Sequence, residues 1–195
     1  KIGGQLVCED GTFENAEGHA LLAQSAEVKG SVYLRKGFNA EGEVSFSSAK
    51  IGGQLTCDDG AFANEKGHAL KAEGVEVRGD VFLCDGFTAK GEVSFGGAKI
   101  GGQLACNNGS FENVKGDALD AQGIEVKGNV FLRGGFAATG VVNLAGAQIV
   151  GQLECDDSTF ENPGDYALNA QGAQMRAFIW RDLKAVKGRI SISGA

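Results

Sequence analysis

The segment Lys1-Ile2-Gly3-Gly4-Gln5-Leu6 decides the fold, because it returns at a fixed interval along the 195-residue sequence. It reappears as residues 50–55 and 99–104, and in altered form as residues 148–153, so the period is 49 residues. A fixed period of this length is typical of repeat proteins, in which each unit buries its apolar face against its neighbours. The sequence therefore predicts a stack of similar coils.

Each 49-residue repeat contains two copies of one strand pattern, because residues 28–34 follow the same pattern as residues 2–8. The two coils of a repeat are 26 and 23 residues long when counted from this strand. Apolar residues lie two apart, or four apart across a glycine, which is the periodicity of a strand with one buried face. Phenylalanines recur at intervals of 25 and 24 residues: Phe13, Phe38, Phe62, Phe87, Phe111, Phe136 and Phe160.

These patterns predict an all-β protein, a right-handed parallel β-helix of about eight coils of 23–26 residues. The handedness follows the general rule for parallel crossover connections. Residues 1–195 form one repeat domain, with a diverged coil from about 175–195. Because the chain ends inside a repeat at both ends and has no capping helix, we expect further repeats or contacts at the ends.

Equivalent positions on successive coils form columns, and one column alternates in charge: Lys1, Glu27, Lys50, Glu76, Lys99, Glu125, Gln148 and Gln174. Opposite charges on adjacent strands stabilise the register, whereas a slip by one coil would bring like charges together. An apolar column runs from Leu6 to Ile179, and a Cys/Leu column runs from Cys8 to Cys155. The same spacing places Arg181 in that Cys/Leu column.

Composition excludes several classes of function. A net charge of -7 argues against a protein that binds nucleic acid, since phosphate contacts need a basic face. No run of about 18 apolar residues is present, so we expect no membrane-spanning segment. The chain begins with Lys1 and has no signal-like segment, so it is interpreted as a processed or excerpted piece whose compartment is unknown.

The five cysteines are interpreted as unpaired. Cys8, Cys57, Cys106 and Cys155 share one core column with a Leu coil between each pair, which places neighbours ~10 Å apart, too far for a disulfide or a shared zinc. Cys84 is expected to point outward as an exposed thiol. Unpaired cysteines favour a reducing compartment, which favours the cytoplasm.

Other polar columns have ordinary structural interpretations. The acidic pairs Glu9-Asp10, Asp58-Asp59 and Asp156-Asp157 alternate with basic coils and are interpreted as a charge ladder, with calcium binding as the alternative. His19 and His68 occupy a column continued by Asp117 and Tyr166, which indicates surface or corner packing rather than catalysis. The asparagines at 15, 64, 113 and 162 are expected to stack along the coils. We predict no catalytic residue, metal or cofactor.

One feature exceeds the needs of the repeat: an aromatic column that alternates with inward positions and should face outward on every second coil. A basic residue is expected beside each ring. Because contiguous exposed apolar surface usually has a use, this face is predicted to bind a partner. It comprises Tyr33, Phe82, Phe131, Trp180, Lys29, Arg78, Lys127 and Arg176.

The segments at residues 26–34 and 42–49 resemble bacterial right-handed β-helix repeat proteins, most closely the pentapeptide-repeat group. Bactofilin-like polymer-forming proteins are another similar class, with shorter coils. The resemblance covers the whole chain at the level of pattern, although coils of the pentapeptide-repeat group close in about twenty residues. Some members of that group are acidic DNA mimics that inhibit a DNA-handling enzyme, and the resemblance implies this role as an alternative for the present chain.

The sequence thus predicts a non-catalytic scaffold that binds another protein or assembles with itself, either end to end or face to face. One alternative is a carbohydrate-active β-helix enzyme, which would need two or three carboxylates breaking the repeat at one place. The other is the DNA mimic that the resemblance implies.

Overall fold

The computed structural model describes residues 1–182 and 184–195, which form an all-β parallel solenoid of about 7 turns of ~25 residues. No helix occurs in these residues, so none is present that could span a membrane. The predicted fold class is therefore confirmed. The sequence predicted about eight coils; eight strands stand side by side in one sheet, and about 7 turns join them.

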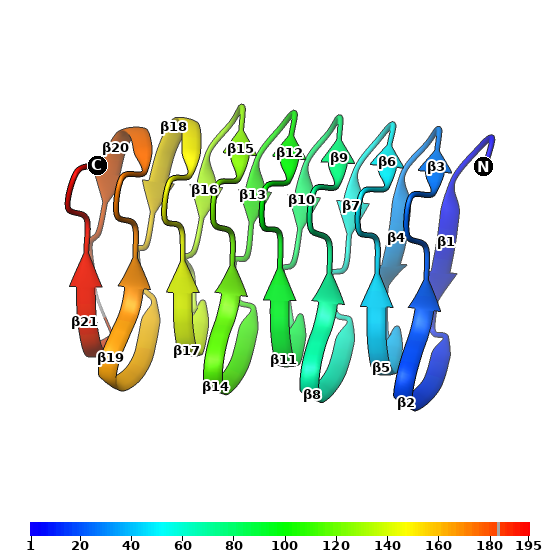
Figure 1. The fold of residues 1–195 in the computed structure, drawn as a ribbon, viewed down its shortest axis with the longest axis horizontal. Coiled ribbons are helices and arrows are strands. Elements are labelled where there is room, and N and C mark those ends of the chain that lie inside the picture. Colours follow the sequence, from blue (N-terminus) through cyan, green and yellow to red (C-terminus); the bar gives the residue numbers. More distant parts are fainter. Residues whose placement is uncertain (183) are drawn as a thin grey trace.

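Each coil contributes one strand to an eight-stranded sheet, which faces the viewer in Figure 1. Strands of 11 and 7 residues alternate along it, so that the structure repeats every second coil. The eight strands are β2 (Thr12–Leu22), β5 (Asn39–Ser45), β8 (Ala61–Lys71), β11 (Thr88–Ser94), β14 (Ser110–Asp120), β17 (Ala137–Asn143), β19 (Thr159–Asn169) and β21 (Ala185–Ser191).

The remaining strands form two short rows, which together make a 13-stranded sheet. The rear row comprises β1 (Leu6–Glu9), β4 (Val32–Arg35), β7 (Leu55–Thr56), β10 (Val81–Phe82), β13 (Leu104–Ala105) and β16 (Val130–Phe131). The upper row comprises β3 (Glu27–Val28), β6 (Lys50–Ile51), β9 (Glu76–Val77), β12 (Lys99–Ile100) and β15 (Glu125–Val126). Two longer strands, β18 (Gln148–Glu154) and β20 (Gln174–Ile179), contribute to both rows.

The coil is right-handed, as the crossover rule predicts. In Figure 1 the chain advances from the N-terminus on the right to the C-terminus on the left. Front strands such as β2 run upward and rear strands such as β4 run downward, which makes the advance that of a right-handed screw.

The core is a continuous column of side chains along the solenoid axis. Seven phenylalanine rings form the predicted ladder, with successive centroids 5.1–5.4 Å apart and planes inclined by 39–46°. Such tilted, offset contacts are favourable for aromatic pairs and add to the gain from burial. The four predicted core cysteines are all free, with Cys57, Cys106 and Cys155 buried and Cys8 half-buried in the first coil.

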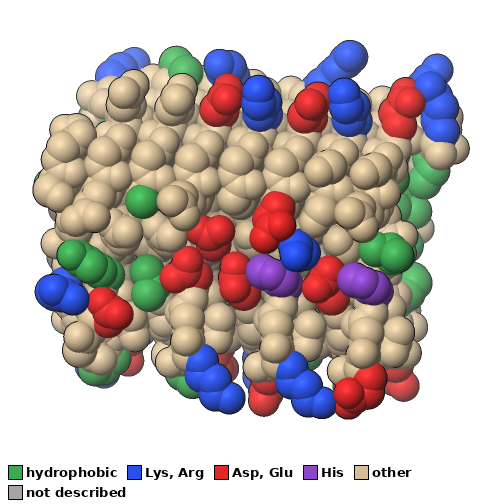
Figure 2. All heavy atoms as spheres, viewed as in Figure 1, with side chains coloured by type: hydrophobic (Ala, Val, Ile, Leu, Met, Phe, Trp, Pro, Cys, Tyr) green, Lys and Arg blue, Asp and Glu red, His purple; other side chains and the backbone are tan. Residues whose placement is uncertain are grey.

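The predicted charge column lies along the outside of the upper row. Its ion pairs join Lys1 to Glu27 at 2.9 Å, Lys50 to Glu76 at 3.6 Å and Lys99 to Glu125 at 3.6 Å. Cations and anions alternate along the corresponding edge in Figure 2. These exposed pairs contribute little energy individually, but they oppose a slip by one coil.

A glycine allows each 7-residue strand to pass beneath the bulge of its longer neighbour. Gly91 in β11 has a φ of +114°, and a Cβ there would lie 2.2 Å from the Asn64 carbonyl oxygen. Any larger residue would clash with backbone that has no freedom to move. The alternation of strand lengths therefore depends on this close approach.

Candidate interaction surfaces

The aromatic side chains predicted to bind a partner lie in the outward column of the rear row. Backbone register places Val7, Tyr33, Thr56, Phe82, Ala105, Phe131, Glu154 and Ile179 at equivalent positions on successive coils. Tyr33, Phe82 and Phe131 thus occur on every second coil, as expected, with a small residue between successive rings. All three side chains are at least partly buried against the sheet, and Phe131 is only 9% exposed.

Trp180 does not belong to this column, which corrects the sequence-based prediction. Pairing of Ile149 with Met175 and of Leu153 with Phe178 leaves one residue fewer at the corner of the last coil. Each residue after this corner therefore occupies the position that the sequence analysis assigned to the residue following it. Phe178 takes the position predicted for Ile179, and Trp180 takes the core position predicted for Arg181.

The physical reason for this shift is burial of the two rings. Trp180 packs against the end of the phenylalanine ladder, with its ring centroid 5.5 Å from that of Phe160 and 5.3 Å from that of Phe178. Arg181 instead lies outside, where its Nη2 is 2.8 Å from the Asp156 carboxylate. With the shorter corner, the partly buried indole of Trp180 fills the core position, where the guanidinium of Arg181 would otherwise be buried.

The four predicted basic residues do not lie beside the rings. All four are exposed at the corner that follows the upper row, and Lys29, Arg78 and Lys127 line hollows there together with upper-row residues such as Glu76. The hollow next to the rings has a different lining. The predicted basic and aromatic residues therefore belong to two surfaces, separated by the corner at Gly30, Gly79 and Gly128. The basic residues are Lys29, Arg78, Lys127 and Arg176.

Guanidinium groups cover two of the three rings. The Arg35 guanidinium lies 4.4 Å from the centroid of Tyr33, and that of Arg133 lies 4.1 Å from the centroid of Phe131. Cation–π contacts of this kind are favourable and cover the face of the ring. The residue two places after Phe82 is Cys84, which carries no such group. Phe82 is therefore the ring of this column that lacks a guanidinium cover.

A hollow of about 500 Å³ opens at this uncovered ring, and we call it the Phe82 hollow. Phe82, Cys84, Ala105 and Phe131 form an apolar cluster at its floor that is separate from the main core. The other lining residues are polar: Asp58, Asp85, Gln103, Asn107 and Arg133. The hollow thus combines an apolar floor with a largely acidic and amide rim.

Cys84 is buried in this cluster, which corrects the prediction of an exposed thiol. Its side chain is 6% exposed, and its Sγ lies 3.2 Å from the Ala105 carbonyl oxygen, which accepts its hydrogen bond. Burial raises the pKa of the Cys84 thiol to about 11. The neighbouring rings, rather than the strand alternation, determine its exposure, so periodicity alone did not predict its burial.

The rim of the Phe82 hollow offers hydrogen-bond acceptors. The Asn107 Oδ1 is buried without a hydrogen-bond partner among the described residues. Burial of an acceptor normally requires a hydrogen-bond partner, so this oxygen is an unsatisfied acceptor beneath the rim of the hollow. One oxygen of Asp58 accepts a hydrogen bond from the Cys84 backbone N–H at 2.9 Å, and burial raises the pKa of that carboxyl group.

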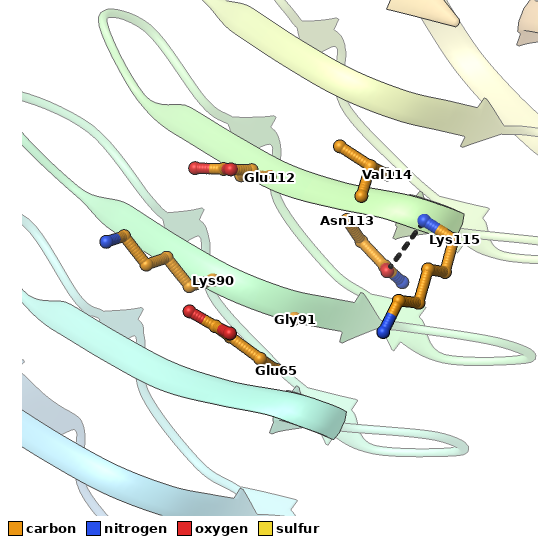
Figure 3. A pocket seen from close by; sticks show the side chains of 7 residues that line it. All are labelled: Glu65, Lys90, Gly91, Glu112, Asn113, Val114 and Lys115. Carbon is orange, nitrogen blue, oxygen red and sulfur yellow. Dashed lines mark hydrogen bonds between the residues drawn. The ribbon is translucent and has the colours of Figure 1, made fainter.

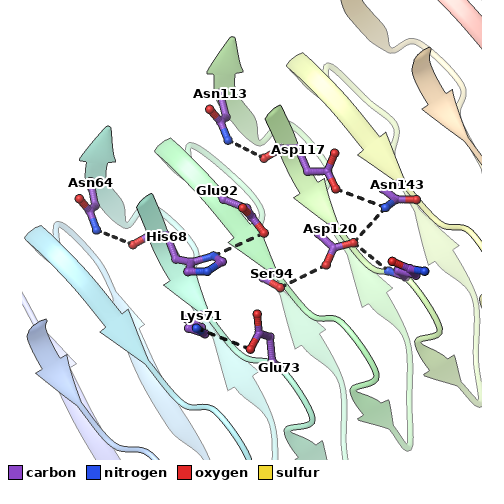
Figure 4. A network of polar contacts seen from close by, with 11 residues as sticks. Asn64, His68, Lys71, Glu73, Glu92, Ser94, Asn113, Asp117, Asp120 and Asn143 are labelled. Atoms are coloured by element: carbon purple, nitrogen blue, oxygen red, sulfur yellow. Dashed lines mark hydrogen bonds and ion pairs between the residues drawn. The ribbon is translucent and has the colours of Figure 1, made fainter. Parts of the chain in front are cut away.

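A second polar surface covers the eight-stranded sheet, where histidine and acidic side chains gather in Figure 2. His68 on β8 and Glu92 on β11 lie side by side, with Nδ1 3.4 Å from Oε1. This carboxylate raises the pKa of His68. His68 was predicted to be a surface or corner packing residue; it lies half-buried on the sheet, and its side chain pairs with Glu92 on the neighbouring strand (Figure 4).

Two aspartates on β14 form a separate group of hydrogen bonds on the same sheet. Asp117 and Asp120 each accept a hydrogen bond of 3.2 Å from the Asn143 amide, and Asp120 also lies 3.4 Å from the Ser94 hydroxyl (Figure 4). Burial raises the pKa of both carboxyl groups. The equivalent residues one repeat earlier are His68 and Lys71. In the sequence, this pair is therefore marked by two positions that differ from their equivalents one repeat earlier.

The third surface feature is a set of ridges, which are formed by the bulges of the 11-residue strands. Each bulge is closed by an asparagine whose side chain donates to the carbonyl oxygen four residues later, as in Asn64 to His68 at 2.9 Å. The predicted stacking of these amides along the coils is therefore wrong, because a bond within the strand satisfies them. A small hollow of about 140 Å³ between two ridges is lined by Glu65, Lys90, Gly91, Glu112 and residues 113–115 (Figure 3).

Metal binding has no ready-made site in the part of the chain that the structure describes. In residues 1–182 and 184–195, no three His, Cys, Asp or Glu side chains are grouped so that they could hold an ion. Several members of the acidic corner are instead paired with cations, as in Glu9 with Arg35 at 2.9 Å and Asp157 with Lys184 at 2.8 Å.

Comparison with known proteins gives no relative: no family model, no curated protein and no solved structure matches this chain.

Proposed function

We propose that this chain is a non-catalytic repeat scaffold that binds another protein through the Phe82 hollow. The observation that carries this proposal is the replacement of the covering arginine by Cys84. Arg35 and Arg133 cover Tyr33 and Phe131, whereas the ring of Phe82 has no such cover. An uncovered ring over an apolar cluster provides a site where a partner side chain gains energy by burial.

The chemistry of the rim indicates what the partner presents. Asp58 and Asp85 are acidic, and the buried Asn107 Oδ1 has no hydrogen-bond donor among the described residues. The cation of the rim, Arg133, is engaged by Glu154 and by the ring of Phe131. A complementary segment therefore carries one large apolar side chain flanked by lysine, arginine or backbone N–H donors.

The resemblance to bacterial right-handed β-helix repeat proteins, and to the pentapeptide-repeat group among them, supports a scaffold rather than an enzyme. A solenoid is rigid along its axis and presents equivalent positions at a spacing of ~4.8 Å per coil. A single irregular position on such a surface is well suited to the recognition of one partner segment.

The test uses Cys84→Arg, which restores the covering arginine without removing any aromatic ring. The probes are fluorescent peptides with a central Leu or Phe flanked by Lys, and the readout is anisotropy. We expect the parent chain to bind the basic peptides, and Cys84→Arg and Phe82→Ser to bind them at least ten times more weakly. Tyr33→Ser, which alters a covered ring, is the matched control and should bind normally.

Three results contradict the proposal. The first is equal binding of acidic and basic peptides, and the second is no binding at all by the folded parent chain. The third is unchanged binding by Cys84→Arg once circular dichroism shows that the variant is folded.

A second candidate function is a carbohydrate-active enzyme, favoured by the Asp117 and Asp120 pair. Two carboxyl groups with raised pKa share the amide of Asn143 at a place where the repeat is broken. Glycoside cleavage uses two such groups, one of them protonated as the acid. Release of reducing sugar from a panel of acidic glycans, abolished in Asp120→Asn, would support this function, and absence of release from every glycan would eliminate it.

A further inference from the structure

A row of basic side chains runs along the corner that follows the upper row of strands, and this feature does not depend on the Phe82 hollow. Strand pairing places the residue after each buried upper-row residue at equivalent positions on successive coils. In coil order this column comprises Lys29, Gly52, Arg78, Gly101, Lys127, Val150 and Arg176. Exposed cations therefore occur on every second coil, and we call them the cationic row.

The cationic row is unpaired, which distinguishes it from most other basic side chains of the chain. None of its four members has an ion pair among the described residues. The glutamates two positions earlier are each paired with a lysine of the Lys/Glu column, as in Glu76 with Lys50 at 3.6 Å. The nearest carboxylates are therefore already partnered, and the positive charge of the row is available to an anion from outside.

The charge of the row recurs where the neighbouring charges are lost. In the last repeat, Gln148 and Gln174 replace the lysine and the glutamate of the Lys/Glu column, but Arg176 still occupies the basic position. The basic residue is lysine in some repeats and arginine in others, so the charge recurs although the side chain varies. The Lys/Glu pairing that opposes a slip by one coil therefore does not account for the cationic row.

Glycines keep the floor between the cations free of side chains. A Cβ at Gly52 would clash with the backbone carbonyl oxygen of Lys29, and a Cβ at Gly101 would clash with that of Arg78. Hollows of about 410 Å³ and 280 Å³ open at these two glycines. The first lies between Lys29 and Arg78, and the second lies between Arg78 and Lys127. The surface therefore alternates between a cation and a hollow.

The spacing of the row favours one conformation of a bound chain. Coils are ~4.8 Å apart, so cations on every second coil are ~9.6 Å apart. A polyproline II helix rises ~3.1 Å per residue and has about three residues per turn, so its side chains on one edge recur every ~9.3 Å. The mismatch accumulates to only about 1 Å over the whole row. The flexible stem of lysine is long enough to absorb it.

Other linear anions match this spacing less well. A β-strand presents side chains on one face every ~6.6 Å. An α-helix returns to the same face after about seven residues, or ~10.5 Å, and would be out of step by ~3 Å over the row. Double-stranded DNA carries one charge per ~1.7 Å of its axis, so most of its phosphates would lack a cation and would lie near Glu76 and Glu125.

We infer that the cationic row binds an acidic segment of another protein in the polyproline II conformation, with a glutamate or aspartate at every third residue. Each carboxylate of the segment pairs with one cation, and the two residues between successive carboxylates lie over the hollows at Gly52 and Gly101. A proline-rich segment adopts this conformation before it binds, so little conformational entropy is lost.

Fluorescence anisotropy with labelled peptides tests this inference on residues 1–195. The matched peptide has four Glu-Pro-Pro repeats, and its isomer has the same composition with the four glutamates adjacent. We expect the chain to bind the matched peptide at least about ten times more tightly than the isomer at low salt. Binding should weaken as salt increases, because exposed charges are screened. The triple variant Lys29→Gln, Arg78→Gln and Lys127→Gln should bind the matched peptide at least about ten times more weakly than the parent.

The control neutralises three exposed lysines of the eight-stranded sheet, with Lys66→Gln, Lys90→Gln and Lys115→Gln, so both triple variants have the same net charge. The control should bind the matched peptide like the parent. Cys84→Arg should also bind it normally, which separates this site from the Phe82 hollow.

Several results would overturn the inference once circular dichroism shows that the proteins are folded. One is no binding of the matched peptide by the parent chain at low salt. Equal binding of the two isomers, or equal losses in both triple variants, would indicate a general attraction of anions. Tighter binding of duplex DNA, of polygalacturonate, or of a helical peptide with a glutamate at every seventh residue would assign the row to a different ligand.

Discussion

Trp180 closes the phenylalanine ladder by packing edge-on against Phe160, with ring planes inclined at 66° and centroids 5.5 Å apart. The ladder therefore does not end in an open ring at the last coil. Because the indole has a coil on one side only, it remains partly exposed, whereas Phe111 in the middle of the ladder is 1% exposed. The ring at the end of the ladder is thus less deeply buried than the rings in the middle.

This difference predicts unequal effects of truncation. Phe111→Ala should lower the free energy of unfolding by about 3–5 kcal/mol, since it removes a fully buried ring and leaves a cavity. Trp180→Ala should cost about 2 kcal/mol, because part of its surface is already in water. Urea denaturation followed by circular dichroism measures both, and equal losses would show that the last coil is as tightly packed as the middle.

Glycine positions should also separate into two groups. Gly91→Ala is expected to cost about 3 kcal/mol or more, because the new Cβ would lie 2.2 Å from the Asn64 carbonyl oxygen. Gly164→Ala is the matched control, since its φ of +92° also lies beyond the left-handed helical region but nothing lies within 4 Å of its Cβ. Its cost should be about 1 kcal/mol. Thermal unfolding of the pair decides whether contact or backbone conformation dominates.

Stability should depend on pH through Asp120. Burial raises the pKa of this carboxyl group in the folded state, so the folded chain holds its proton more tightly than the unfolded chain. Stability from this group is therefore present at low pH and is lost as pH rises from the unfolded pKa of about 3.9 through the folded pKa. Asp120→Asn should raise stability at pH 7, and the gain should vanish below about pH 3.

The control for that experiment is Asp85→Asn, which alters an exposed carboxylate. Its effect on the free energy of unfolding should be small at both pH values. A gain for Asp120→Asn that is the same at pH 3 and pH 7 would show that packing, rather than ionisation, is responsible.

Thiol labelling should distinguish the cysteines by coil. Cys8 lies half-buried at the first coil, whereas Cys57, Cys106 and Cys155 are buried and burial raises the pKa of each thiol. The thiolate is the reactive form, so these three and Cys84 should resist alkylation in the folded protein at pH 8. Mass spectrometry should locate the first label on Cys8. Rapid labelling of Cys84 would contradict its burial beneath Phe82.

The sequence was sufficient for the repeat itself. The phenylalanine ladder and the Lys/Glu column follow from the 49-residue period, because parallel stacking brings equivalent residues together without any change in register. Lys50 meets Glu76 and Lys99 meets Glu125, as predicted. These contacts depend only on counting residues along the chain.

What the sequence did not predict depends on how side chains of particular sizes fit together. Trp180 shifts by one place because the last corner is one residue shorter, and only burial of the rings favours that register. Cys84 is covered by its neighbours although its position alternates outward. The Asp117 and Asp120 pair was visible as two departures from the period, but their proximity required the spacing of three strands.

The alternation of 11-residue and 7-residue strands restricts how such a molecule can change its length. Removing 49 residues would join equivalent positions, so that Lys meets Glu and a bulge meets Gly91 or its counterpart as before. Removing a single coil would place two 11-residue strands side by side. The carbonyl groups of one bulge would then lie against the next bulge, without the glycine that now leaves space for them. The chain can therefore be lengthened or shortened only by whole 49-residue repeats of two coils, in steps of ~9.6 Å.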